Sequence, residues 1–507
     1  MGNPQCTELP SSGSSNGAVA DLNFDGYDDL LLGMEKSGNA GMRNAYIYYG
    51  SPEGLSERNL IRVPAHRCTA SAIGDFNGDG RHDVALITED KLRIFYQSEY
   101  GFEPMVFVDF DIGFDQIGAA DLDRDGYSDL VAFSEDGPPR IYWGGPDGID
   151  LERRSDVLIG DGADGRIEEE QMAVSEEEGV SAASPLPKVI DLGGRPHLFV
   201  PFAKRVYLVP VDHDRTFDKG LTFACRNTFS VAVGDVTGSG HPDLVFVGRD
   251  HNEQGECSWI YWGGPDGFSE ARRTALPSMR ACDVAVGDLN GNGCDDVAIC
   301  QKQNDESYSV ESLVYRGTRE GIDPEPIHLA THGARRVFVA RTSDDPNPQL
   351  IFVNQLARNA IGDVDSTIYY GGADGFSTDR VCQLPGRGAS TAAVCDTTDN
   401  GWPDVILANS SENAMNLDPG SYLFLGGPEG FSREPDLVFP TGGAGAWRSP
   451  TWTATAGSIW SWHISGMQRL RFTTARPRAS TWITPSASTY RKGRGIFASR
   501  AGSAWRT

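Results

Sequence analysis

The sequence of 507 residues lacks several features that would place it in common classes of protein. No apolar run approaches the roughly 20 residues that a membrane-spanning helix needs, so we expect no membrane insertion. The nine cysteines are odd in number and include no Cys-x-x-Cys pair, so neither a zinc site nor a regular set of disulfides is predicted. Positive charge is scarce as well, with 44 Lys and Arg against 71 Asp and Glu. The net charge of −27 disfavours nucleic acid as a partner, because nucleic acid attracts positive protein surfaces.

Motifs of the common enzyme classes are also missing. The sequence contains no nucleophile elbow, no phosphate-binding P-loop, no dinucleotide fingerprint and no His-Glu-x-x-His zinc motif. We therefore expect a protein that is not an enzyme.

The sequence does contain an internal repeat of about fifty residues. Three units open with an acidic segment of nine residues, at Asp21–Asp29, Asp75–Asp83 and Asp121–Asp129, and three looser copies begin at Asp235, Asp288 and Asp396. An apolar strand follows each segment, and then an aromatic strand with a Gly-rich turn such as Ile141-Tyr-Trp-Gly-Gly-Pro-Asp-Gly. Two further units, marked at Val189 and Arg341, keep this frame without the acidic segment. The eight markers are 54, 46, 68, 46, 53, 53 and 55 residues apart.

Each unit has the pattern of several short β-strands separated by turn residues, with no helical period. Four strands per unit at this spacing are typical of a propeller blade. We therefore predict an all-β fold, a β-propeller of seven or eight four-stranded blades formed by residues 1–440. A linear β-solenoid is the alternative, although its repeats are usually shorter. The Ile-Tyr-Trp stripe is then interpreted as core packing.

The acidic segments place oxygen-bearing side chains at positions 1, 3, 5 and 9, a Gly at position 6 and a backbone carbonyl at position 7. Such an oxygen cage suits a hard cation, and Ca²⁺ better than Mg²⁺. An EF-hand would need a Glu at position 12, where this sequence has Leu32, Leu86 and Ala132. We therefore predict several Ca²⁺ sites in β-hairpin loops; the alternative is an Asp/Asn/Gly turn without a metal. The predicted ligands, with position 7 acting through its carbonyl, are Asp21, Asn23, Asp25, Tyr27 and Asp29; Asp75, Asn77, Asp79, Arg81 and Asp83; Asp121, Asp123, Asp125, Tyr127 and Asp129; and Asp288, Asn290, Asn292, Cys294 and Asp296.

Over residues 15–440 the sequence resembles the FG-GAP or VCBS repeat, the unit of the integrin α-subunit-like β-propeller. The resemblance rests on the acidic loop and the Tyr-x-Gly-Gly-x-x-Gly turn recurring in order. It implies Ca²⁺ in the hairpin between two strands of a blade, usually seven blades, and a role in adhesion or binding of a protein or glycan ligand. It also implies an extracellular, cell-surface or periplasmic location, although the N-terminus carries no export signal and looks incomplete. The alternative function is a propeller enzyme, a hydrolase or lyase acting on a polysaccharide at the central channel.

Residues 441–507 differ from the rest of the chain, with ten basic residues, no Asp or Glu and six of the ten Trp. In three earlier units 21 residues separate the Gly-rich turn from the next acidic loop, and the same count from Gly430 reaches Thr451. In a shifted reading frame the codons of Trp452 and Thr453 encode Asp, and the neighbouring codons permit most of a ninth loop. We predict that this segment is frameshifted, poorly ordered and without a packed core. The alternative is a genuine basic tail for nucleic acid or an acidic partner.

Overall fold

A computed structural model describes residues 14–34, 44–89, 91–134, 138–157, 188–202, 204–217, 220–345, 347–358, 360–372, 376, 380–409, 420–439 and 452–453. All of them belong to the first of two compact units, Met1–Gly466 and Met467–Thr507. Beyond residue 440 the structure describes only Trp452 and Thr453, so the predicted disorder of the tail lies outside the described residues. The predicted boundary at residue 440 stays a prediction.

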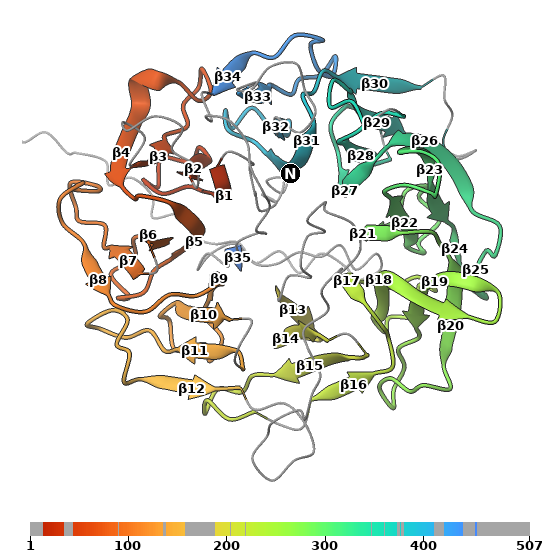
Figure 1. Ribbon diagram of the computed structural model, residues 1–507, viewed down its shortest axis with the longest axis horizontal. Coiled ribbons are helices and arrows are strands. Elements are labelled where there is room, and N and C mark those ends of the chain that lie inside the picture. Colours follow the sequence, from red (N-terminus) through yellow and green to blue (C-terminus); the bar gives the residue numbers. More distant parts are fainter. Residues whose placement is uncertain are drawn as a thin grey trace, which may run out of the picture. The chain divides into compact units, whose positions relative to one another are not determined.

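The described residues form β-strands, with one short 3-10 helix, η1 (Glu57–Asn59). The strands build eight four-stranded antiparallel sheets, each from strands consecutive or nearly so in the chain (Figure 1). The first four sheets comprise β1 (Ser14–Ala20), β2 (Asp29–Met34), β3 (Asn44–Tyr48) and β4 (Leu60–Pro64); β5 (Cys68–Gly74), β6 (Asp83–Thr88), β7 (Lys91–Phe95) and β8 (Val108–Phe110); β9 (Gln116–Ala120), β10 (Asp129–Phe133), β11 (Arg140–Tyr142) and β12 (Arg154–Asp156); and β13 (Lys188–Leu192), β14 (Arg195–Pro201), β15 (Val206–Pro210) and β16 (Leu221–Phe223).

The other four sheets repeat the same order of strands. They comprise β17 (Thr228–Gly234), β18 (Asp243–Asn252), β19 (Gly255–Tyr261) and β20 (Arg273–Pro277); β21 (Ala281–Gly287), β22 (Asp296–Gln301), β23 (Ser309–Tyr315) and β26 (Ile327–His332); β27 (Ala334–Ala340), β28 (Gln349–Asn354), β29 (Ser366–Tyr370) and β30 (Val381–Leu384); and β31 (Ala389–Cys395), β32 (Asp404–Asn409), β33 (Ser421–Phe424) and β34 (Leu437–Phe439). A small hairpin of β24 (Gly317–Thr318) and β25 (Gly321–Ile322) interrupts the sixth sheet, and β35 (Trp452–Thr453) pairs in parallel with β9.

The second strand of each sheet is buried on both faces, which explains its continuous apolar sequence. In β2, Leu31 packs with the residues of the second sheet, whereas Leu30 and Leu32 pack with those of the eighth. Because successive side chains of a strand point to opposite faces, one apolar run contributes to two cores. Burial of each such Leu stabilises the fold by about 1.5–3 kcal/mol.

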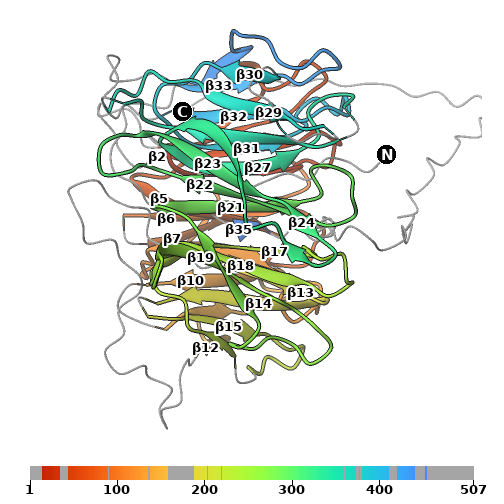
Figure 2. The same ribbon diagram turned by 90° about the vertical axis from the view of Figure 1, so that its right-hand side faces the viewer.

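Eight apolar clusters lie between consecutive sheets, so the sheets are the blades of a closed ring. Seven clusters join blades 1 to 8 in chain order, and the eighth joins blade 8 to blade 1 through side chains such as Ile406 and Tyr48. The first strands of the blades lie nearest the centre in Figure 1, and Figure 2 shows the same blades from the side. The predicted all-β propeller is confirmed, and the number of blades is eight.

The fourth blade departs from the predicted repeat. Its marker residue, Val189, lies inside β13 rather than at the start of a loop. A turn of only two residues, Gly193 and Gly194, joins β13 to β14, with φ of +65° and +85°. Turns of this length need positive φ at their centre, which two glycines allow. This blade therefore has no acidic loop, as expected from its sequence.

Candidate metal-binding loops

The acidic segments connect the first and second strands of their blades. In the first loop both oxygens of Asp21 accept backbone N–H groups, from Asp25 at 3.1 Å and from Gly26 at 2.9 Å. The position-1 carboxylates Asp75 and Asp121 accept the same two N–H groups in their loops. These bonds close the segment into a turn around its first side chain. The turn requires a glycine at position 6, since φ there lies between +83° and +97° in the three loops.

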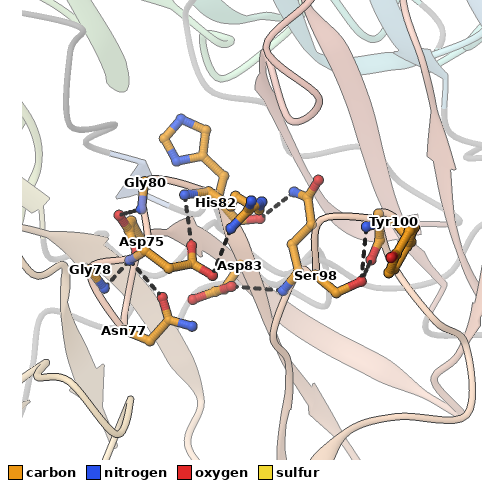
Figure 3. Close-up of polar contacts among 12 residues, drawn as sticks. Asp75, Asn77, Gly78, Gly80, His82, Asp83, Ser98 and Tyr100 are labelled. Carbon is orange, nitrogen blue, oxygen red and sulfur yellow. Dashed lines mark hydrogen bonds and ion pairs between the residues drawn. The ribbon is translucent and has the colours of Figure 1, made fainter.

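Positions 3 and 5 point their oxygens into the same turn. Asn23 Oδ1 accepts the N–H of Asp25 at 3.0 Å, and Asp25 Oδ1 accepts that of Tyr27 at 2.9 Å. The second loop is built in the same way, and Figure 3 shows the oxygens of Asp75 and Asn77 turned toward the backbone of their own loop. Position 7 contributes a backbone N–H in each loop, from Tyr27, Arg81, Tyr127 and Cys294.

Position 9 has a different environment, because it begins the second strand and is buried. Asp29 accepts the N–H of Leu22 at 2.7 Å and that of Gly50, on the connection after β3, at 2.7 Å. Asp83 likewise accepts the N–H groups of Phe76 and Gln97, at 3.0 and 2.9 Å. Burial raises the pKa of Asp29 and of Asp83 to about 8, with a further rise from neighbouring loop carboxylates, against the lowering effect of the two amides.

Position 9 makes the same two hydrogen bonds in the third loop and in the loops with fewer carboxylates. Asp129, Asp243, Asp296 and Asp404 each accept the N–H of position 2 and an N–H from the turn after the third strand. In the seventh blade Gln349 takes this place and accepts the N–H of Thr342 at 2.6 Å. Position 9 therefore holds the hairpin to its blade whether or not a cation is present. The capacity of a loop for a cation depends mainly on positions 1, 3 and 5.

The third loop brings its carboxylates closest together. In the described part of the chain, one group of three acidic side chains places oxygens within 4.8 Å of one another, namely Asp121, Asp123 and Asp129. An all-oxygen donor set of this kind fits a hard cation such as Ca²⁺. The first and second loops have the same backbone frame with Asn23 and Asn77 at position 3. At positions 1, 3, 5 and 9 they therefore carry one carboxylate fewer than the third loop.

The loop at Asp288 has the same frame but weaker donors. Asn292 and Gly293 donate their N–H groups to Asp288, at 3.1 and 2.9 Å. The Asn290 side chain also donates its Nδ2 to Asp296 at 3.0 Å. Cys294 is a buried thiol that forms no disulfide. At positions 1, 3, 5 and 9 this loop therefore offers two carboxylates where the third offers four.

Contacts between loops of neighbouring blades are a feature that the repeat pattern does not reveal. Ser128, at position 8 of the third loop, accepts the N–H of Asp75 at 3.0 Å and donates its own N–H to the Asp75 carbonyl at 2.7 Å. Asp295 makes the corresponding contacts with Asp235, at 2.8 and 3.1 Å. Since these bonds join position 8 of one loop to position 1 of the preceding blade's loop, the loops lie together on one face of the ring.

A second missed feature is an arginine from another blade that reaches the third loop. Arg215 lies between β15 and β16, and its guanidinium donates to Asp123 and Asp125 at 2.6 and 2.9 Å. Ninety-two residues separate Arg215 from Asp123. No sequence spacing could have predicted this contact, because it depends on how blades 3 and 4 pack against each other.

Two open hollows lie at equivalent places beside loops that lack the full acidic set. One, of about 530 Å³, is lined by Thr237, Ser239, Trp262, Arg272 and Glu320 among others. The other, of about 420 Å³, is lined by Ser343, Asp345, Tyr370, Arg380 and Pro428 among others. Each combines an aromatic residue at the end of a third strand, an arginine ten residues later and a turn of the next blade.

The innermost strands carry a polar network that bears on the enzyme alternative. Ser230 Oγ donates to Asp283 at 2.8 Å, and Lys188 Nζ donates to the Val231 carbonyl at 2.6 Å. Asp283 also accepts the N–H of Val337 at 3.1 Å. Each of these hydrogen bonds joins the first strand of one blade to the first strand of the next, over four successive blades. The network is therefore explained as a set of contacts between blades.

The fold and the loops define the class of protein, a β-propeller with FG-GAP-like repeats. A family model for the FG-GAP-like repeat matches residues 75–132 and 224–299, which include the loops at Asp75, Asp121, Asp235 and Asp288. Integrin alpha pat-2 of Caenorhabditis briggsae is 32% identical over 84 residues, or 15% of this chain and 7% of that protein. The match thus spans a small part of the relative's length. The predicted FG-GAP repeat and the similarity to integrin α are confirmed.

Solved structures with a match include two crystal structures of BBS1N in complex with ARL6DN, one soaked with mercury and one with lead. Their TM-scores are 0.38 and 0.36 at 11% and 12% identity, over 69% of this chain and 92% of theirs. Similarity at this level carries no argument about the fold or the function of this chain. In the described part of the chain no helix is long and apolar enough to cross a membrane.

Proposed function

We propose that this protein is a calcium-stabilised β-propeller that acts outside the cell as a binding or adhesion module for a protein or glycan ligand. The observation that carries the proposal is the acidic hairpin loop, which recurs with one hydrogen-bond frame in blades 1, 2 and 3. Each copy holds carboxylates at positions 1 and 5 next to a buried carboxylate at position 9. Like charges so placed repel one another, and a divalent cation relieves that repulsion.

Positions 1, 3 and 5, the carbonyl at position 7 and the outer lone pairs of position 9 would hold the ion. The cation would cross-link a hairpin that already has the required turn. Because the loops lie between the first two strands, the ion would stabilise the blade and its contact with the next blade. Millimolar extracellular Ca²⁺ is sufficient to fill sites of moderate affinity, which supports the proposed location. The matched segment of integrin alpha pat-2 supports the same assignment.

The two hollows are the proposed surface for a ligand. Trp262 is half-buried beside Thr237 and Ser239, and its Nε1 donates to Thr274 at 2.9 Å, which fixes the indole. A fixed aromatic ring beside hydroxyl and charged groups suits the apolar face and the hydroxyls of a sugar, or a polar peptide. No observation favours the polysaccharide hydrolase or lyase, and we do not propose it.

Two experiments on the full-length chain test the proposal. Thermal unfolding is compared in Ca²⁺, in Mg²⁺ and after chelation, and Ca²⁺ alone should raise the melting temperature, because a ligand that binds only the native state adds RT ln(1 + [L]/Kd) per site. A glycan array and a panel of immobilised extracellular matrix proteins are then probed with and without Ca²⁺. We expect saturable binding that Trp262→Ala abolishes, in a variant that circular dichroism shows to be folded. Identical melting curves in all three conditions would contradict the calcium part.

A further inference from the structure

We infer that Arg215 competes with the cation for the third loop, so that occupancy of this loop controls a contact between blades 3 and 4. The inference rests on the proposed calcium binding and concerns a residue outside all the acidic segments. In the described structure Arg215 lies on the connection Val211–Phe217, between β15 and β16, and reaches across to the preceding blade.

The guanidinium bridges two of the proposed ligands. Nε donates to Asp123 Oδ2 at 2.6 Å, and Nη2 donates to Asp125 Oδ2 at 2.9 Å. The other oxygen of each carboxylate accepts a backbone N–H of the loop. Every carboxylate oxygen at positions 3 and 5 thus has a hydrogen-bond donor. A cation that takes either side chain as a ligand must share it with, or displace, a positive group in direct contact.

The charges of the three acidic loops differ in a way that matches this contact. The first and second loops have Asn at position 3 and therefore three carboxylates among positions 1, 3, 5 and 9, whereas the third has Asp123 and four. The loop with a carboxylate at position 3 is the loop that receives an arginine from another blade.

The backbone and the neighbouring side chains of the connection Val211–Phe217 hold Arg215 against the third loop. Arg215 has a φ of +64°, a conformation that non-glycine residues seldom adopt. The strain is offset by the side-chain contacts, which include the ring of Trp143 at 5.0 Å from the guanidinium carbon. His213, two residues earlier, hydrogen-bonds through Nδ1 to the Asp123 carbonyl at 2.7 Å. Both contacts end on blade 3, so the connection joins the two blades.

Two consequences follow from the competition. The third loop binds Ca²⁺ more weakly than it would without Arg215, although it has the most carboxylates at positions 1, 3, 5 and 9. When Ca²⁺ binds there, the guanidinium leaves Asp123 and Asp125, and the connection Val211–Phe217 loosens. The third loop thereby links calcium concentration to the contact between blades 3 and 4.

Calcium titration of the full-length chain and its variants tests the inference. Arg215→Ala should raise the Ca²⁺ affinity of one site by at least about tenfold, because a positive charge close to a divalent ion is removed. Arg215→Lys should give an intermediate affinity, since an ammonium cannot bridge both carboxylates. Arg93→Ala is the matched control: Arg93 pairs with Asp109 at 2.6 Å and stacks on Phe107 at 3.8 Å, away from the acidic loops. It should leave the titration unchanged.

Hydrogen exchange supplies an independent measurement. Ca²⁺ should speed amide exchange over residues 211–217 in the wild type, while the same segment in Arg215→Ala should exchange fast in both conditions. The equivalent connection of blade 5, residues 262–272, serves as the control segment. The inference would be overturned if a folded Arg215→Ala variant and the wild type gave superimposable calcium titrations. If the alanine variant does not fold, the same comparison is made with Arg215→Lys. If Asp25→Ala still reduced calcium binding in that case, the proposed function would stand and only the inference about Arg215 would fail. If neither the wild type nor any variant bound calcium, the proposed function and the inference would both be refuted.

Discussion

The buried position-9 carboxylates make the calcium dependence of stability a function of pH. Asp29 and Asp83 have their pKa raised to about 8 by burial, from the ordinary value of 3.8. The folded chain therefore binds these protons more tightly than the unfolded chain. In the absence of a cation, the contribution of these two groups to stability should be largest below about pH 4 and should decline as the pH rises toward about 8.

The size of this loss of stability follows from the size of the pKa shift. One pKa unit corresponds to about 1.4 kcal/mol, so that a rise from about pH 4 to about pH 7 destabilises the fold by about 4 kcal/mol per carboxylate. The two groups together amount to about 8 kcal/mol, which is comparable with the whole free energy of unfolding of an ordinary domain. A bound cation favours the ionised form and removes this loss.

Urea unfolding at several pH values, with and without calcium, measures the effect. One sample is stripped of metal on a chelating resin, and the other contains millimolar Ca²⁺. The gap between the two free energies of unfolding should widen from about pH 5 to about pH 8. Groups far from the loops, such as His197, whose pKa burial lowers, affect both samples equally. A gap that stays constant or narrows toward pH 8 would refute the reasoning.

Three substitutions test the packing around the loops by urea unfolding in calcium. Gly78→Ala should destabilise the fold by about 1–3 kcal/mol more than Gly80→Ala. Both glycines have positive φ, but only at Gly78 would a Cβ clash with the Tyr127 ring. Equal losses would contradict the contact between the second and third loops. Ser128→Ala should cost about 1–3 kcal/mol, since it leaves the buried N–H of Asp75 without its acceptor; an unchanged midpoint would argue against that bond. Leu31→Ala should cost about 2–5 kcal/mol, because it opens a cavity in the cluster between blades 1 and 2.

The fold could be predicted from the sequence because the repeat is local. A loop of nine residues, an apolar strand and a Gly-rich turn recur within each unit, and their spacing gives the blade. The choice between seven and eight blades could not be made, since it depends on whether blade 8 meets blade 1 through contacts such as Ile406 with Tyr48. The marker at Val189 was misplaced because the frame was assumed to contain a loop where two glycines suffice.

The site was less predictable, for reasons of distance along the chain. The spacing of Asp21, Asn23 and Asp25 places three oxygens in one turn, and their backbone bonds have that arrangement. The partner of Asp29 is the N–H of Gly50, 21 residues away, so the structural role of position 9 is not visible in the motif. Arg215 is farther still and belongs to another blade. Such contacts follow from the packing of strands within a blade and of one blade on the next, and they have no local sequence signal.

The central claim is that the acidic loops hold calcium in the native protein, and a count of bound ions tests it most directly. The full-length chain is dialysed to equilibrium against buffer with millimolar Ca²⁺ and excess Mg²⁺, and the calcium in the protein compartment is measured by atomic absorption. The account predicts about three Ca²⁺ ions per chain in excess of the buffer. Calcium equal to that of the buffer, in a chain that is folded by circular dichroism, would contradict it.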